Sequence, residues 1–395
     1  MKKSRFLLPL LLMAMLQFSC RTDDEIIYSE QETLPDTVKT DTIVPPAERW
    51  QPVGMYVLCE GNMGSNKCTL DYLDLSVNPP VYNRNIYSER NPQAVKELGD
   101  VGNDVEIYGS RLWMVINCSN KVEVATADDC RRLGKIDIAN CRSLAFHDGY
   151  AYVSSFYGPL LDPEDLEVGT IFKIDTLTLQ KVDSVFVGWQ PEEMAVVDGK
   201  LYVANSGGYR DPDYDHTLSI IDLETFREER RMDIGLNPHR VRADRQGKLW
   251  VTTRGDYYTI PPRLYCLKPD EKGNMQVDNV MDLAVSDLCI VGDSLYFYGS
   301  QWSEITMSNT VGYGIINTST QELHDAPFAS QLPRIQMPYA IMVHPDTRDV
   351  FLMDAKNYVS SGELFCLSPD GVLKWSVKTG DIPGHACFLM RRTEE

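Results

Sequence analysis

The chain has 395 residues, of which 57 are acidic and 38 basic, so its formal net charge is −19. A surface this acidic argues against nucleic acid and anionic membranes as partners, although it leaves a neutral ligand open. The length exceeds that of an average domain, but a closed ring of repeats can form a single domain of this size.

The first 19 residues are typical of a secretory signal. Basic residues at positions 2–5 precede an apolar run over 6–18 that is too short to span a membrane as a mature helix. A small residue then precedes Cys20, which resembles a bacterial lipobox, although Gln17 stands where an aliphatic residue is usual. We therefore expect lipid attachment at Cys20; the alternative is a secreted protein in which this cysteine is unmodified.

Residues 20–50 form the expected lipidated N-terminus and a flexible tether, because they are rich in Asp, Glu, Thr and Pro and poor in apolar residues. The acidic run at 23–25 resembles the signal that sends Bacteroidetes lipoproteins to the outer face of the outer membrane. Two or three acyl chains provide stable anchoring. No later stretch of the sequence is long and apolar enough for a transmembrane helix.

The clearest pattern in the chain is a meander of four predicted strands at 194–197, 201–204, 218–223 and 227–234. A tight Asp198-Gly199 turn joins the first two strands, which is a strong hairpin signal. Four short strands cannot bury both faces of their sheet alone, so the meander requires neighbours of its own kind.

Copies of the first two strands recur at steps of roughly 40–50 residues, the spacing of propeller blades. The pairs are 102–108 with 112–115, 141–146 with 151–154, 238–243 with 249–252, 285–290 with 295–298, and 338–343 with 350–353. Two unpaired halves remain, at 384–390 and 55–59. Together they predict a blade closed by strands from both chain ends, which removes bare sheet edges. The sequence thus predicts an all-β, seven-bladed β-propeller over residues 51–395.

The first strand of each propeller blade lines the central channel, so the residue before each apolar first strand is expected at the channel mouth. This alignment predicts a ring of Asp104, Ser143, Glu193, Arg240, Asp287, Tyr339 and His385. Each residue is polar or amphipathic. The ring is either a dedicated ligand contact or the polar lining that any solvent-filled funnel needs.

Loops after the second strands open on the same face and carry many aromatic residues. Rigid aromatic rings rimmed by polar groups are typical of a binding surface, although some of these rings are expected to pack under their own loops. With Trp189 from a loop that enters a blade, the expected ligand-binding residues are Asp104, Phe156, Tyr157, Trp189, Glu193, Tyr209, Arg240, Tyr257, Asp287, Trp302, Tyr339, Tyr358 and His385.

Catalytic motifs are sparse. The sequence lacks a Gly-x-Ser-x-Gly elbow, a His-Glu-x-x-His helix and a Walker loop, so we expect neither an enzyme nor a resident cofactor. The carboxylates of Asp104, Glu193 and Asp287 could together hold a calcium ion, as in some propeller lactonases. Nothing in their spacing selects this arrangement over a polar funnel.

The cysteines leave the disulfide pattern open. Cys266 and Cys366 occupy the same repeat position in different blades and are expected to be free, buried thiols. Cys59 could pair with Cys68 across a loop, or with Cys387 on the adjacent strand, in an exported protein. No spacing resembles a zinc site.

The stretch 201–241, with Leu-Tyr-Val-Ala-Asn-Ser-Gly at its start, resembles the YVTN/YncE-type propeller repeat. Residues 55–65 resemble the opening strand of a Bacteroidetes group of surface lipoproteins, which have Asn-Glu-Gly-Asn where this chain has Cys59-Glu-Gly-Asn62. That group includes proteins that capture cobalamin.

The resemblance implies a cell-surface, outer-membrane lipoprotein that binds cobalamin or another corrinoid. It also implies that the protein passes this ligand to a TonB-dependent outer-membrane transporter barrel. Two alternatives stay open: a calcium-dependent propeller hydrolase, and a glycan- or protein-binding component of another uptake system.

Overall fold

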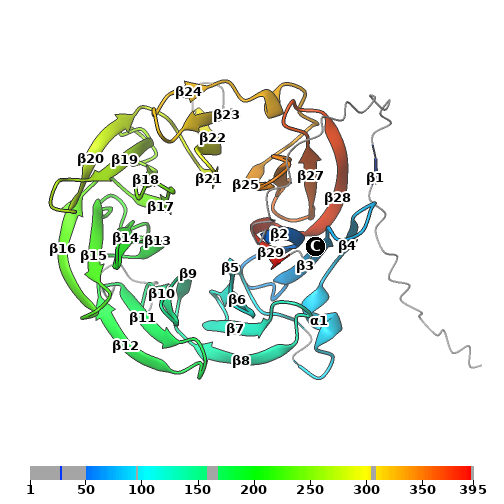
Figure 1. Ribbon diagram of the computed structural model, residues 1–395, viewed down its shortest axis with the longest axis horizontal. Helices are drawn as coiled ribbons and strands as arrows, with labels where there is room; N and C mark the ends of the chain where they lie inside the picture. The colour runs from blue at the N-terminus through cyan, green and yellow to red at the C-terminus, as the bar shows by residue number, and fades with distance from the viewer. Residues whose placement is uncertain (1–26, 29–49, 95–96, 158–167, 304–307, 393–395) are drawn as a thin grey trace, which may run out of the picture.

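The computed structural model describes residues 27–28, 50–94, 97–157, 168–303 and 308–392. The predicted signal, the tether and Cys20 lie outside these ranges, apart from the two residues of β1 and Trp50. In the described ranges, seven antiparallel sheets stand around a common axis, and this confirms the seven-bladed propeller (Figure 1).

Each sheet has one strand at each of four radial positions. The inner strands are β5 (Gly102–Tyr108), β9 (Cys141–His147), β13 (Pro191–Val197), β17 (Pro238–Ala243), β21 (Asp287–Val291), β25 (Pro338–Val343) and β29 (Pro383–Arg392). The second strands are β6 (Arg111–Ile116), β10 (Tyr150–Ser155), β14 (Lys200–Asn205), β18 (Leu249–Thr253), β22 (Ser294–Ser303), β26 (Val350–Asp354) and β2 (Trp50–Cys59).

The third strands are β7 (Lys121–Thr126), β11 (Thr170–Asp175), β15 (Thr217–Asp222), β19 (Arg263–Pro269), β23 (Ser308–Asn317), β27 (Ser361–Leu367) and β3 (Thr69–Asp74). The outer strands are β8 (Arg132–Asp137), β12 (Lys181–Phe186), β16 (Arg227–Asp233), β20 (Met275–Met281), β24 (Leu323–His324), β28 (Leu373–Asp381) and β4 (Val81–Asn83). The remaining elements are β1 (Ile27–Tyr28), which pairs with β28, the helix α1 (Ile86–Arg90) and the 3-10 turn η2 (Pro327–Ala329).

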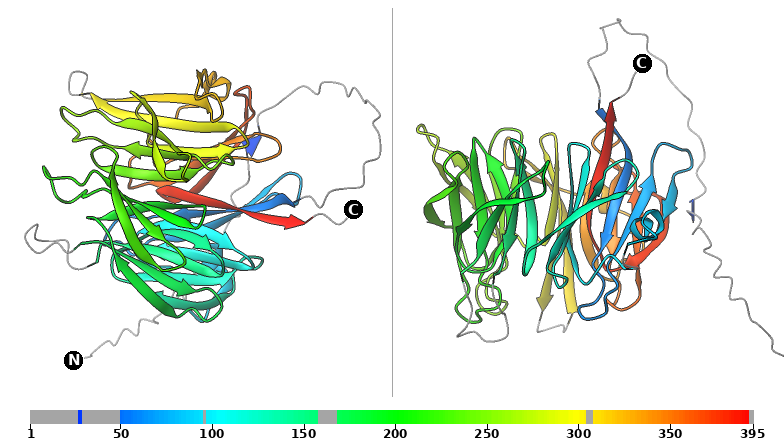
Figure 2. Two further views of the ribbon diagram at one scale, coloured as in Figure 1. Left: turned by 60° about the vertical axis from the view of Figure 1, so that its left-hand side comes forward. Right: turned by 90° about the horizontal axis from the view of Figure 1, so that it is seen from below.

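Strands from the two ends of the chain close the ring. β29 pairs antiparallel with β2, so that Phe388 lies opposite Met55 and His385 lies opposite Leu58. The predicted closure is therefore confirmed. Trp50 and Arg392 are also partners in this register, so the chain enters and leaves the ring at one face (Figure 2). His385 lies toward the other face.

The core is divided into seven clusters, each between two neighbouring blades. Trp113 and Val124 of one blade, for example, pack with Leu144 and Val153 of the next. Second strands are buried on both faces because each contributes to two clusters, whereas an outer strand such as β12 is almost wholly exposed. Hydrophobic burial between adjacent blades thus holds the ring together.

Six of the seven described inner strands carry a β-bulge near their first residue. In β13, for example, Pro191 pairs with Asn205 and Met194 with Val203, so three residue steps on the inner strand match two on its partner. Equivalent register shifts occur in β5, β9, β17, β25 and β29. A bulge re-aims side chains, and it allows two consecutive residues to face the channel where strict alternation allows one.

The nine cysteines in the described ranges are all free thiols. Cys266 and Cys366 are buried, as predicted. Both proposed disulfides are wrong. Cys59 packs toward the preceding blade and Cys68 toward the following one, on opposite faces of the sheet. Cys59 is paired in register with Pro383 rather than with Cys387.

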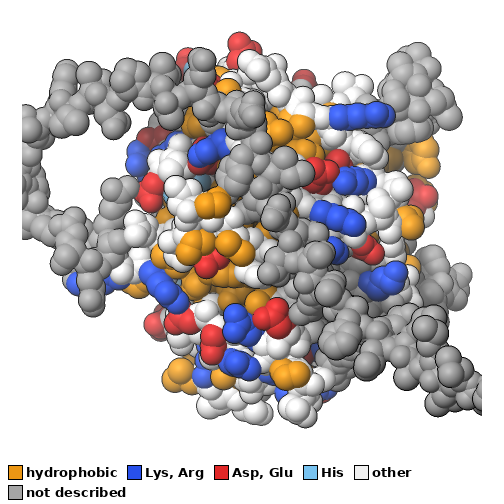
Figure 3. Space-filling view, turned by 90° about the vertical axis from the view of Figure 1, so that its right-hand side faces the viewer, with side chains coloured by type: hydrophobic (Ala, Val, Ile, Leu, Met, Phe, Trp, Pro, Cys, Tyr) orange, Lys and Arg blue, Asp and Glu red, His pale blue; other side chains and the backbone are white. Residues whose placement is uncertain are grey.

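Charged side chains are mixed on the side of the ring shown in Figure 3, where Lys and Arg alternate with Asp and Glu around small hydrophobic groups. The visible, described part of that side therefore shows no single acidic field. Among the described residues, no helix has the length and apolar character to cross a membrane.

Candidate functional site

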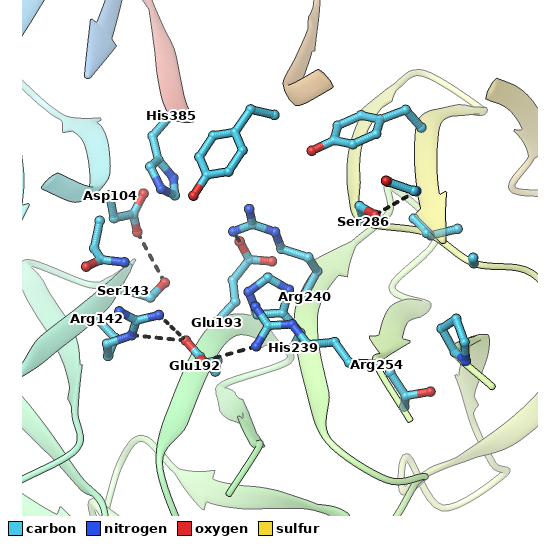
Figure 4. Close-up of a pocket in the computed structure, with 18 of the residues that line it drawn as sticks. Asp104, Arg142, Ser143, Glu192, Glu193, His239, Arg240, Arg254, Ser286 and His385 are labelled. Carbon is cyan, nitrogen blue, oxygen red and sulfur yellow. Dashed lines mark hydrogen bonds and ion pairs between the residues drawn. The ribbon is translucent and has the colours of Figure 1, made fainter. Parts of the chain in front are cut away.

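A cavity of about 460 Å³ opens where the inner strands begin. Its wall includes the predicted ring residues Asp104, Ser143, Glu193, Arg240, Tyr339 and His385, together with Tyr257 from a loop (Figure 4). Asp287 instead lines a second cavity of about 350 Å³. Asp104, Arg240 and His385 line both cavities and so mark the boundary between them.

The bulges bring further polar residues to the mouth that strand alternation did not predict. Each lies directly before a predicted ring residue: Asn103, Arg142, Glu192 and His239. Because a bulge lets two consecutive side chains face the same way, blades 1 to 4, counted from β5, each contribute a polar pair. Arg254 and Glu60 join them from the loops after second strands. The signal in the sequence is two adjacent polar residues before an apolar strand.

Three ring carboxylates connect consecutive blades. Asp104 Oδ2 accepts a hydrogen bond from the backbone N–H of Leu144 at 2.8 Å. Glu193 Oε2 accepts one from Val241 at 2.8 Å. Asp287 accepts one from Ile341 in the same way, at 3.1 Å. Each carboxylate therefore satisfies a backbone N–H group inside the neighbouring inner strand, which is a structural role beside any role in binding.

Ion pairs continue this connection around the mouth. Arg240 reaches Glu193 at 3.3 Å and Asp287 at 3.2 Å. Burial disfavours the charge of Arg240, but Asp287 and Glu193 outweigh it and raise its pKa. Arg142 donates twice to Glu192 Oε2, at 3.1 and 3.0 Å, and Arg254 lies 3.6 Å from Glu192 Oε1.

Charge states at the mouth follow from these neighbours. Burial would raise the pKa of Glu192, but Arg142 and Arg254 hold it below the usual carboxyl range. Burial and the adjacent Arg254 and Arg240 lower the pKa of His239 well below 6.5, so this imidazole is neutral. Opposite them, Glu60 accepts a hydrogen bond from the Tyr339 hydroxyl at 3.1 Å and lies 3.4 Å from His385 Nε2.

The calcium arrangement finds no support. Asp104, Glu193 and Asp287 come from alternate blades, and each is engaged with the following blade. The described ranges contain no group of three or more His, Cys, Asp or Glu side chains placed to hold a metal ion.

Three aromatic pairs surround the mouth, each with rings in edge-to-face contact. Tyr209 packs on Phe156 at 5.9 Å, Tyr257 on Tyr214 at 6.2 Å, and Tyr358 on Tyr339 at 5.7 Å between ring centroids. The first member of each pair is exposed, by 56, 62 and 38% respectively. An exposed ring supported by a second ring is a rigid contact surface for a ligand.

The other predicted aromatic residues have different surroundings. Phe156 is buried beneath Arg142, whose guanidinium lies 4.8 Å from the ring centre, so Phe156 supports the site without facing it. Tyr157 turns toward Phe186 on the outer strand, away from the channel. Trp189 is covered by the Arg210 guanidinium at 3.9 Å. Trp302 lies on β22, but its side chain is outside the described residues.

The second cavity is lined mainly by apolar residues, with Glu106 and Arg242 as its charged side chains apart from those at its boundary and Asp287. Burial and the neighbouring Asp104 raise the pKa of Glu106 to about 8, although Arg242 opposes the shift. This carboxyl is therefore largely protonated near neutral pH.

The ring of four-stranded blades defines the chain as a β-propeller protein. No protein-family model matches the sequence, and no curated protein matches it. Among solved structures, it is similar to a quinonprotein alcohol dehydrogenase-like protein from Bacteroides thetaiotaomicron. The TM-score is 0.59 and the identity 12%, over 85% of this chain and 78% of the other.

Two further solved structures have comparable scores. A candidate 6-phosphogluconolactonase from Bacteroides uniformis aligns with a TM-score of 0.58 and 11% identity, over 86% of this chain and all of the other. Hydrazine synthase of Kuenenia stuttgartiensis aligns with a TM-score of 0.56 and 14% identity, over 74% of this chain and 95% of the other. At these identities the similarity establishes the fold alone.

Proposed function

We propose that this protein is a non-enzymatic, lipid-anchored binding protein of the cell surface. It captures cobalamin or a related corrinoid at the channel mouth and passes it to a TonB-dependent outer-membrane transporter. The observation that carries the proposal is the rim of exposed, supported tyrosines, Tyr209, Tyr257 and Tyr358, around a polar cavity. A corrinoid is wide, flat and fringed with amides, so it matches apolar contact at the rim and hydrogen bonding at the centre.

The charges at the mouth favour a ligand of little net charge. The cavity wall carries four carboxyl groups, of Glu60, Asp104, Glu192 and Glu193, and three guanidinium groups, of Arg142, Arg240 and Arg254. Most of these groups already pair with one another. A strongly charged ligand would have to break these pairs, whereas amide groups can bond to their free edges.

The chain entry point suits an anchored receptor. β2 runs from Trp50 to Cys59, and Cys59 pairs with Pro383 at the mouth end of β29. The chain therefore enters the ring at the face opposite the mouth. With a lipid on Cys20, the tether would attach on that opposite face and leave the mouth accessible to ligand.

Calorimetric titration of the mature lipoprotein in detergent with cyanocobalamin tests the proposal. Saturable binding of one ligand per chain, with a Kd at or below the micromolar range, is expected. Absence of heat at micromolar protein would overturn the proposal.

A second candidate function is glycan capture, which the same supported tyrosines favour. Sugar rings stack on exposed aromatic side chains, and their hydroxyls bond to paired carboxylates and guanidinium groups such as Glu192 and Arg142. A panel of neutral oligosaccharides in the same titration separates the two functions. Binding of a glycan without binding of cyanocobalamin would select this one.

A further inference from the structure

Two loops at the mouth, on different blades, share one construction. The loop after β18 carries Asp256, whose carboxylate accepts the backbone N–H groups of Tyr258 and Thr259, at 2.9 and 2.7 Å, and the Thr259 hydroxyl at 2.7 Å. The loop after β26 carries Asn357 at the equivalent position. Its side-chain oxygen accepts Val359 N–H at 3.1 Å, and Ser360 N–H and Oγ at 2.8 Å.

The correspondence extends to the backbone. The residue before the Asp or Asn has a positive φ in both loops, 67° at Gly255 and 52° at Lys356. Glycine is required at position 255, because a Cβ there would lie 1.9 Å from the Ile260 carbonyl oxygen. The residue after the Asp or Asn is a tyrosine in both loops, again with positive φ: 65° at Tyr257 and 62° at Tyr358.

A left-handed backbone is unfavourable for a bulky residue. Phe226 also has a positive φ, of 52°, but its ring is buried, so packing offsets the strain. Tyr257 and Tyr358 are exposed, and each contacts a single deeper ring. Such strain holds a side chain in a fixed direction. Tyr157 has the same features away from the channel, so position beside the cavity is what links the strain at Tyr257 and Tyr358 to binding.

Both tyrosines are placed beside the cavity. Tyr257 lines it directly, and its hydroxyl lies 3.5 Å from Asn237 Nδ2. Tyr358 packs on Tyr339, which lines the cavity, and Asn62 from the next blade donates to the Tyr358 carbonyl. The blade 6 loop is therefore held by Tyr339 of its own blade and by Asn62 of the next blade.

We infer that the matched loops of blades 4 and 6 are a preorganised aromatic clamp, in which Tyr257 and Tyr358 grip apolar surface of the bound ligand. Asp256 and Asn357 are the positioning residues that fix the two rings before the ligand arrives. This inference rests on the proposed function and adds which rim residues supply the apolar contact and how they are held. The clamp therefore takes a ligand that contacts both loops at once.

The test uses Tyr257→Asn and Tyr358→Asn in the mature protein, because asparagine tolerates a positive φ. Each variant is expected to bind cyanocobalamin about tenfold more weakly, and the double variant about a hundredfold more weakly, since the loops lie on separate blades. Melting temperatures are expected to stay within about 1 °C of the wild type, because relief of backbone strain offsets the lost ring contact. Tyr257→Phe is expected to retain affinity within about twofold, since the ring supplies the contact.

Tyr157→Asn is the matched control. Tyr157 is an exposed tyrosine with a φ of 46°, but it faces Phe186 on the outer strand. This substitution is expected to leave affinity unchanged. Unchanged binding in both clamp variants, or an equal loss in the control, would overturn the clamp. Absence of binding by the wild type would overturn the proposed function and the clamp with it, so the two failures are distinguishable.

Discussion

The carboxylate of Glu193 provides a quantitative test of how the blades are joined. Substitution Glu193→Ala removes a buried hydrogen bond to the Val241 N–H, and it takes a carboxylate away from Arg240 and Arg242. A charge-assisted buried hydrogen bond contributes about 2 kcal/mol, and the incompletely paired guanidinium groups add about 1 kcal/mol. Arg240 keeps its contact with Asp287, which limits this second cost. The expected loss is about 3 kcal/mol in the free energy of unfolding.

Calorimetric unfolding measures this loss. An unfolding entropy of about 2 cal/mol/K per residue over roughly 340 residues gives about 0.7 kcal/mol/K, so the melting temperature should fall by about 4 °C. Glu229→Ala is the control, because Glu229 is an exposed carboxylate on an outer strand that forms a surface ion pair with Lys200. The control is expected to change stability by less than about 0.5 kcal/mol. A Glu193→Ala melting temperature within about 1 °C of the wild type would refute the inter-blade role.

Three further predictions concern pH, thiols and loop order. The pKa of Glu106 is raised to about 8, so between about pH 5 and 8 the folded protein retains a proton that the unfolded chain has released, and stability falls as the pH rises. In urea titrations, the free energy of unfolding of Glu106→Gln should therefore exceed that of the wild type by about 1–3 kcal/mol at pH 8.5 and by almost nothing at pH 4.5. Equal differences at both pH values would contradict this prediction. Alkylation after unfolding without reductant should label both Cys59 and Cys68, and a cross-linked peptide of the two would contradict their separation. Asp256→Ala should weaken cyanocobalamin binding several-fold by releasing the loop that holds Tyr257, with little change in melting temperature; unchanged affinity would refute the positioning role.

The blades were predictable because their signals are local and repeated. The Asp198-Gly199 turn and the alternation on either side of it place β13 and β14 within a few residues of their observed bounds. The unpaired halves at 55–59 and 384–390 were sufficient for closure, because a propeller cannot leave an open edge. Repetition of one local unit thus determines the global architecture.

The mouth was only partly predictable, because its geometry depends on bulges and on loop direction. Strict alternation predicts that the side chains of Glu193 and Arg240 face the channel and that those of Glu192 and His239 do not. The bulges of β13 and β17 bring Glu192 and His239 to the channel as well. The sequence also does not indicate the direction in which an aromatic side chain in a loop points. Phe156 folds beneath an arginine, where a sequence pattern cannot distinguish it from an exposed ring.

The disulfide predictions failed for a related reason. Cys59 ends one strand and Cys68 immediately precedes the next, so they are close in sequence and in space along the blade. Their side chains nevertheless enter different inter-blade cores, because neighbouring positions can face opposite sides of a sheet. Proximity along a hairpin is therefore insufficient for a disulfide.

Calorimetric titration of cyanocobalamin into the wild-type lipoprotein and the Tyr257→Asn, Tyr358→Asn double variant tests the central claim most directly. Capture at the mouth predicts one binding site per chain in the wild type and an affinity about a hundredfold lower in the variant. The two proteins are expected to have the same melting temperature. Equal affinity in the two proteins would show that the corrinoid binds elsewhere. A wild type that releases no heat would contradict corrinoid capture itself.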